Sequence, residues 1–111
     1  MRGDPLQISV NPGERSGEVV LHLTGPLILD NLFDFQRTWR EQSAPSITVD
    51  LTHVPYVDSS GVGSLVNMHV SRQKIGGSVC LVGVSERVLT ALAVTKVDRI
   101  FSIVNTGAAS A

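Results

Sequence analysis

The sequence is poor in the residues that build crosslinks and metal centres. It has a single cysteine, Cys80, which excludes an internal disulfide and cannot form a cysteine-based metal site by itself. Cys80 stands in the apolar stretch SVCLVGV, which predicts a buried structural thiol. The three histidines, His22, His53 and His69, show no spacing with carboxylates that is typical of a metal site. We therefore expect neither a metal nor another cofactor.

An excess of charge of one sign and a long hydrophobic run are also missing. The formal net charge is −1, and this balance argues against electrostatic binding to nucleic acid. No apolar run approaches the roughly 18 residues that span a bilayer. The first residues, MRGDPLQ, lack the apolar core of a signal peptide. We therefore expect a cytoplasmic protein that partners neither nucleic acid nor membrane.

What the chain does have is the length and composition of one globular domain. Its 111 residues are enough for one domain with a hydrophobic core and too few for two. Apolar residues make up 42% of them, which is ordinary for a globular protein. We expect the domain at residues 6–104, between a flexible N-terminus at 1–5 and a flexible tail at 105–111.

The strands are predicted from apolar stretches that lie between clusters of turn residues. They are expected at residues 6–10, 19–25, 46–52, 78–84 and 100–104. The stretch 78–84 is continuously apolar, which predicts a strand buried on both faces. Helical stretches separate all the strands after the second. This order predicts an α/β fold: one mostly parallel sheet of about five strands, with an antiparallel first strand and three to four helices.

The helices are predicted from apolar residues at helical spacing. The first is expected to begin with Asp30 as its N-cap, the second to run to about Lys74, and the third to follow a Ser85 cap to about Thr95. The side chains expected in the core are Leu32, Phe33, Phe35, Gln36 and Trp39, then Val62, Leu65, Val66, His69 and Val70, then Val88, Leu89 and Leu92.

The turn DSSGVG at residues 58–63 joins a predicted strand to the second helix. Ligand and modification sites collect at such junctions of a parallel sheet. In a purely structural interpretation, one serine caps the helix. This leaves the other serine unexplained, and also Gly61 and Gly63, because glycine costs roughly 0.5–1 kcal/mol against alanine inside a helix.

Two chemical interpretations of the turn fit poorly. A phosphate-binding loop needs a third glycine where Val66 stands, and a Lys-Ser/Thr pair that does not follow. A hydrolase nucleophile needs glycine two residues before the serine. Val57 precedes Ser59 by two residues and Asp58 precedes Ser60, so the nucleophile elbow is absent for either serine. We therefore expect no enzyme activity.

The fourth interpretation is phosphorylation of a serine at the helix start. A phosphoserine adds about −1.5 to −2 charges at pH 7, and a helix N-terminus favours anions. The fold should survive the modification, while Asp58 adds to the negative charge of the surface. A partner docked here would then meet repulsion, and a penalty of about 3 kcal/mol lowers affinity more than a hundredfold.

The chain resembles the STAS domain of bacterial anti-sigma-factor antagonists over roughly residues 47–101. In that family a strand ends in D-S-S-G-[LV]-G, and a helix, a glycine pair, a strand and a helix with a V-x-x-x-L pattern follow. Residues 57–63 (VDSSGVG), the pair Gly76-Gly77 and the pair Val88 and Leu92 match this order. The earlier L-x-L-x-G at Leu21, Leu23 and Gly25 fits the family's second strand.

This resemblance implies a non-enzymatic regulator that binds a kinase-type anti-sigma factor and displaces its sigma factor. The kinase would phosphorylate Ser59, with Ser60 as the alternative, and a serine phosphatase would reverse the step. ATP and Mg²⁺ would belong to the partner. The residues expected to contact the partner are Asp58, Ser59, Ser60, Gly61, Val62, Gly63 and Ser64. Similar domains also serve as scaffolds or as parts of transport complexes, and this alternative stays open.

The sequence departs from the family after the second strand. The family commonly continues G-x-L-D, and that acid takes part in partner contacts. Here the stretch is Gly25-Pro26-Leu27-Ile28, with isoleucine in place of the acid. The next helix, DNLFDFQRTWREQ, is more aromatic than usual, and part of it is a candidate for exposed partner surface.

Overall fold

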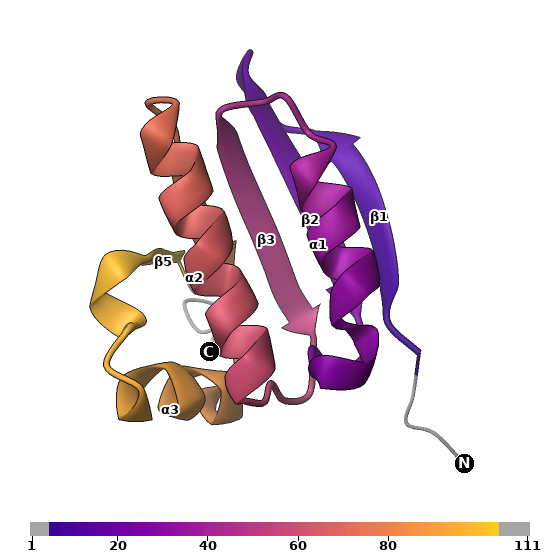
Figure 1. Cartoon of the computed structure of the whole chain (residues 1–111), viewed down its shortest axis with the longest axis vertical. Helices are drawn as coiled ribbons and strands as arrows, with labels where there is room; N and C mark the ends of the chain where they lie inside the picture. Colours follow the sequence, from indigo (N-terminus) through magenta and orange to yellow (C-terminus); the bar gives the residue numbers. More distant parts are fainter. Residues whose placement is uncertain (1–4, 105–111) are drawn as a thin grey trace.

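A five-stranded sheet runs through the computed structural model, which describes residues 5–104 (Figure 1). The strands lie side by side in sequence order. They are β1 (Gln7–Pro12), β2 (Glu18–Thr24), β3 (Ser46–His53), β4 (Ser78–Val82) and β5 (Ser102–Val104). β1 pairs antiparallel with β2, and the other neighbours are parallel. The predicted α/β fold with an antiparallel first strand is confirmed. Residues 1–4 and 105–111 lie outside the described part, and so do the two predicted flexible ends, apart from Pro5.

Three α-helices connect the parallel strands. They are α1 (Leu32–Arg40), α2 (Ser59–Lys74) and α3 (Glu86–Val94), with short 3-10 helices η1 (Leu29–Asn31) and η2 (Asp98–Ile100). Each connection steps to the next strand in the same direction. Because such crossovers are right-handed, all three helices fall on one face of the sheet, and Figure 1 shows α1 and α2 lying together over that face. Within residues 5–104, the other face carries no helix.

The prediction that residues 78–84 are buried on both faces is wrong. In β4, Val79 and Leu81 are buried, whereas Ser78 is exposed and Cys80 is half-buried. The cause is the helix layer on one side only. The expected buried thiol of Cys80 therefore lies partly open on the helix-free face. Burial still raises its pKa, and the nearby Glu18 carboxylate adds to that rise.

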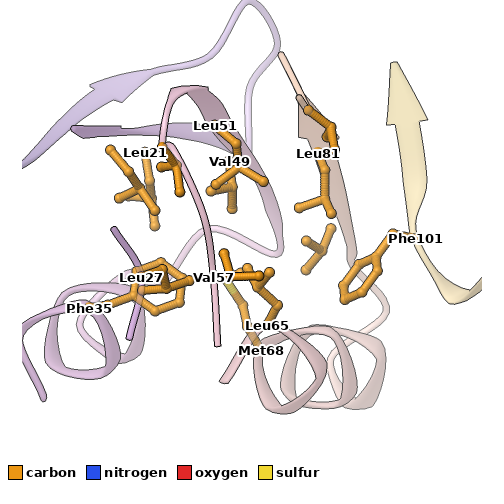
Figure 2. Close-up of a cluster of buried hydrophobic side chains, with 14 of the residues drawn as sticks. Leu21, Leu27, Phe35, Val49, Leu51, Val57, Leu65, Met68, Leu81 and Phe101 are labelled. Atoms are coloured by element: carbon orange, nitrogen blue, oxygen red, sulfur yellow. The ribbon is translucent and has the colours of Figure 1, made fainter. Parts of the chain in front are cut away.

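The hydrophobic core lies between the covered face of the sheet and the helices (Figure 2). Its fully buried side chains include Leu21, Val49 and Leu81 from the sheet and Phe35, Leu65 and Met68 from the helices. Leu27, from the loop after β2, belongs to the same core and is fully buried. That loop therefore sits firmly against the molecule.

Several predicted core residues point to solvent instead. Phe33 is 79% exposed, Val70 43% and Leu89 39%. The buried side chains of α2 include Met68 and Arg72, so the side of the helix that carries Val70 faces solvent. Arg72 is compatible with burial because its guanidinium donates to two backbone carbonyls of the loop after α1, at 2.9 Å each.

The helix ends agree with the sequence at two places and differ at one. Ser85 caps α3, as predicted, and Gly76 ends α2 with φ of 80°. Asp30 is not an N-cap, because η1 precedes α1 and the α-helix begins only after Asn31. The Asn31 side chain donates to the Pro26 carbonyl at 2.9 Å instead of capping α1.

Candidate functional site

The DSSGVG turn starts α2 at the carboxyl end of β3. Asp58 is the N-cap, and its Oδ1 accepts a hydrogen bond from the Gly61 N–H at 2.8 Å. Its Oδ2 accepts from the Leu29 N–H at 3.1 Å. One carboxylate thus joins η1 to the start of α2. Because Asp58 makes the cap, neither serine does, and the purely structural explanation of the serines fails.

The two serines lie in the first turn of α2, but neither of them caps the helix. Ser59 is exposed and Ser60 is half-buried. Neither hydroxyl has a hydrogen-bond partner within residues 5–104. The Ser59 hydroxyl therefore stands free at the end of the helix where the backbone N–H groups give a partial positive charge. This arrangement can accept an anionic group without losing a native hydrogen bond.

Only one of the two glycines of the turn is required by a contact within the fold. Gly61 is buried, and a Cβ there would collide with the Leu27 carbonyl oxygen. The same carbonyl accepts from the Asp58 N–H at 3.3 Å, and the Leu27 N–H donates to Tyr56 at 3.2 Å. Gly61 is thus explained by a contact inside the chain. A Cβ on exposed Gly63 would meet no atom of the described residues within 4 Å, so no contact among them requires that glycine.

The predicted partner-binding residues divide into two layers. Four of them form the outer layer: Asp58, Ser59, Ser60 and Gly63. The other three lie beneath: Gly61, Val62 and Ser64, with Val62 5% and Ser64 1% exposed. The inner layer can shape the docking surface but does not present side chains to it. Partner binding and phosphorylation of Ser59 stay predictions.

Other residues near the turn were not foreseen from the sequence. Leu29 is 62% exposed and is fixed to Asp58 through its backbone. On the α3 side, the Arg87 guanidinium carbon lies 5.0 Å from the centre of the Tyr56 ring, a cation–π distance. No local sequence pattern predicts these contacts, because η1 and α3 come close to the start of α2 only in the folded chain.

A second polar cluster lies on the helix-free face. His22 Nδ1 is 2.9 Å from Asp50 Oδ2, and Asp50 Oδ1 accepts from the Thr52 hydroxyl at 2.6 Å. Burial raises the pKa of Asp50, but the hydrogen bonds from Thr52 and His22 outweigh it and hold that pKa below its usual value. Within residues 5–104 no three His, Cys, Asp or Glu side chains gather closely enough to bind a metal. None of the helices there is long and apolar enough to cross a membrane.

Comparison with known proteins gives one family. The family model described as the STAS domain matches residues 9–109. A candidate anti-sigma factor antagonist from Thermotoga maritima is 25% identical, with a TM-score of 0.80 over 93% of this chain and 92% of its own. No curated protein sequence matches the chain.

Two less similar structures show the same fold. The Bacillus cell fate determinant SpoIIAA, in its phosphorylated form, is 17% identical, with a TM-score of 0.67 over 95% of this chain and 96% of its own. The murine anion transporter Slc26a9 is 19% identical, with a TM-score of 0.70 over 82% of this chain and only 16% of the transporter. At these identities the likeness is one of fold alone.

Proposed function

The chain belongs to the STAS domain family, as its resemblance implied, and we propose that it is an anti-sigma-factor antagonist switched off by phosphorylation of Ser59. It binds a kinase-type anti-sigma factor in the cytoplasm and so releases a sigma factor. The partner kinase, with its own ATP and Mg²⁺, then phosphorylates Ser59, and a serine phosphatase restores the binding form. The protein itself is not an enzyme.

The observation that carries this proposal is the free, exposed hydroxyl of Ser59 beside a cap made by Asp58. A kinase needs an accessible hydroxyl, and a reversible switch needs a fold that does not depend on it. Both conditions hold at Ser59. The likeness to the Thermotoga antagonist supports the same role, and phosphorylated SpoIIAA is a protein of this fold that carries the modification.

The switch works through charge at the docking surface. A phosphate on Ser59 adds about −1.5 to −2 charges, which the N-terminal N–H groups of α2 tolerate. The Asp58 carboxylate, which precedes Ser59 and caps the helix, is itself an anion and adds to the negative charge of this surface. A partner seated over Ser59 would face this anion at close range. A penalty of about 3 kcal/mol would lower its affinity more than a hundredfold.

The direct test is phosphorylation by the kinase-type anti-sigma factor of the source organism. Incubation with that kinase and ATP should add one phosphate, and fragmentation mass spectrometry should locate it on Ser59. The Ser59→Ala variant should accept none. Phosphate found only on Ser60, or on neither serine, would contradict the assignment.

The charge mechanism is tested by two substitutions at one position. Ser59→Asp and Ser59→Ala should melt at similar temperatures, because no native hydrogen bond is lost, while only Ser59→Asp loses the partner. Ser43→Asp is a matched control: it adds the same charge at an exposed position between α1 and β3, at the opposite end of β3 from Ser59, and should bind the partner like the wild type. Equal partner affinities of Ser59→Asp and Ser59→Ala would rule out the charge mechanism.

A second candidate function is an unphosphorylated scaffold or module of a transport complex. The specific observation in its favour is the shared fold of the transporter Slc26a9. Genome neighbours separate the two cheaply, since an adjacent kinase-like anti-sigma gene favours the antagonist and transporter genes favour the module. A protein purified from its native cytosol without any phosphate, even with phosphatase inhibitors present, would also favour the module.

A further inference from the structure

Two apolar side chains face solvent on η1 and the start of α1. Leu29 is 62% exposed and Phe33 79%. The other aromatic residues of α1 behave differently, with Phe35 fully buried and Trp39 only 3% exposed. An exposed phenyl ring keeps apolar surface in water that burial against another molecule would remove. Phe33 therefore suits a contact surface.

Leu29 lies beside the DSSGVG turn, and Phe33 follows four residues later in the first turn of α1. The Leu29 N–H donates to Asp58 Oδ2 at 3.1 Å, and Asp58 directly precedes Ser59. Fully buried Leu27 anchors the loop that leads into η1. The position of Leu29 relative to Ser59 is thus set by a hydrogen bond and by the core. A molecule that covers Ser59 would reach Leu29 as well.

The apolar patch is too small to serve as an interface alone. Two side chains of this size bury on the order of 200–400 Å², whereas a stable dimer needs roughly 800 Å² from each partner. A second copy of this chain docked here would also cover Ser59 and exclude the kinase. The patch fits better as the energetic centre of a larger, mixed interface, where a few apolar anchors supply most of the affinity.

Resting on the proposed function, we propose that Leu29 and Phe33 are the apolar anchor with which the chain docks on its kinase-type anti-sigma factor. The partner offers an apolar pocket for the Phe33 ring, next to the surface that faces Ser59. Different residues then carry the two functions: Leu29 and Phe33 provide the binding affinity, and the phosphate on Ser59 removes it.

The charged residues of α1 beside Phe33 indicate which charge the partner carries. A shallow groove of about 460 Å³ runs along α1 from Phe33 to Arg40 and Glu41. Arg37 is paired with Asp34 at 2.8 Å. Arg40 instead lies over the Trp39 ring at 5.4 Å and forms no ion pair within residues 5–104. A carboxylate of the partner opposite Arg40 would form an ion pair with it.

The test compares alanine substitutions at two ends of the molecule, with the purified anti-sigma kinase of the source organism as the probe. Phe33→Ala should weaken binding about 30-fold, which is about 2 kcal/mol, and Leu29→Ala about tenfold. Ile75→Ala is the matched control, because Ile75 is 56% exposed but follows the far end of α2. It should change affinity less than twofold. Isothermal titration calorimetry gives the affinities, and circular dichroism checks the fold.

The outcomes separate this inference from the proposed function. The Phe33→Ala loss should be equal at low and high salt, whereas an Arg40→Ala loss should shrink as salt rises. If Phe33→Ala and Leu29→Ala bind like the wild type while Ser59→Asp does not bind, the anchor is wrong and the switch stands. A wild-type dimer that Phe33→Ala dissociates would give the patch to a second copy and overturn the inference. If the wild-type chain binds no anti-sigma kinase, both proposals fall.

Discussion

The first turns of α2 and α3 use similar residues in different roles. In both helices a polar side chain accepts the N–H three residues on: Asp58 from Gly61 at 2.8 Å, and Ser85 from Val88 at 3.2 Å. In α3 the serine is the cap, so its hydroxyl is engaged. In α2 the carboxylate takes the cap, and Ser59 follows it at the surface. A serine at a helix start is free for modification only where another residue caps the helix.

The largest expected difference between the two turns concerns their third helical position. Val88 packs its side chain into the core, whereas Gly61 brings its backbone against the Leu27 carbonyl. Gly61→Ala should lower the free energy of unfolding by about 2–3 kcal/mol, because a rigid backbone atom has to move. Gly63→Ala is the control and should raise it by up to about 1 kcal/mol, since nothing lies within 4 Å.

Urea denaturation of both glycine variants measures this difference. It should appear as a clear fall of the midpoint for Gly61→Ala and a small rise for Gly63→Ala, at unchanged slope. Equal stabilities would show that the loop after β2 yields easily, and that Gly61 is not required by its contact with Leu27.

The next effect concerns the caps themselves. Asp58→Ala removes two hydrogen bonds, to the start of α2 and to η1, and should cost about 2 kcal/mol. Ser85→Ala removes one and should cost about 1 kcal/mol. Asp58→Asn should recover about half of the loss, because its one amide oxygen can accept from the Gly61 N–H, while its NH2 group is a donor and cannot accept from the Leu29 N–H. Chemical denaturation checks all three variants. Equal losses for the two alanine variants would mean that the bond to Leu29 adds no stability.

The choice of cap shows where sequence reasoning stopped. Pattern and turn residues were enough to predict the sheet, its antiparallel first strand, the Ser85 cap and the end of α2 at Gly76. They did not identify the cap of α2: the structural interpretation gave it to one of the two serines, whereas Asp58, an equally good capping residue just before them, makes it. The choice is made by the fold: Gly61 has to meet the Leu27 carbonyl, and this fixes where the helix starts.

The sequence could not show which aromatic residues of α1 are exposed, for a related reason. Phe33 and Phe35 lie two positions apart in α1, and aromatic content alone suggested that both are buried. Two positions on a helix face about 200° apart, so only one can face the sheet. Burial of Phe35 therefore exposes Phe33. Likewise, the helix-free face of β4 follows from the strand order, which local apolar content does not encode.

The smallest expected effect concerns the C-terminal ends of the same two helices. Their hydrogen bonds match: Gly77 N–H donates to Arg72 at 2.8 Å, and Val97 N–H to Leu92 at 3.0 Å. In each helix the residue just before this N–H donor adopts the left-handed backbone conformation. That residue is Gly76 after α2, with φ of 80°, and Lys96 after α3, with φ of 64°.

The α3 end therefore carries a strain that the α2 end avoids, because a Cβ disfavours this conformation. Lys96→Gly should raise the free energy of unfolding by about 0.5–1 kcal/mol, less than the full strain, since glycine also gains entropy in the unfolded chain. Lys96→Ala is the matched control: it removes the same charge, keeps the Cβ, and should not stabilise the protein. Calorimetry should show a melting temperature a few degrees higher for Lys96→Gly alone. An equal rise for Lys96→Ala would assign the gain to the lost charge, and the two helix ends would then be equally relaxed.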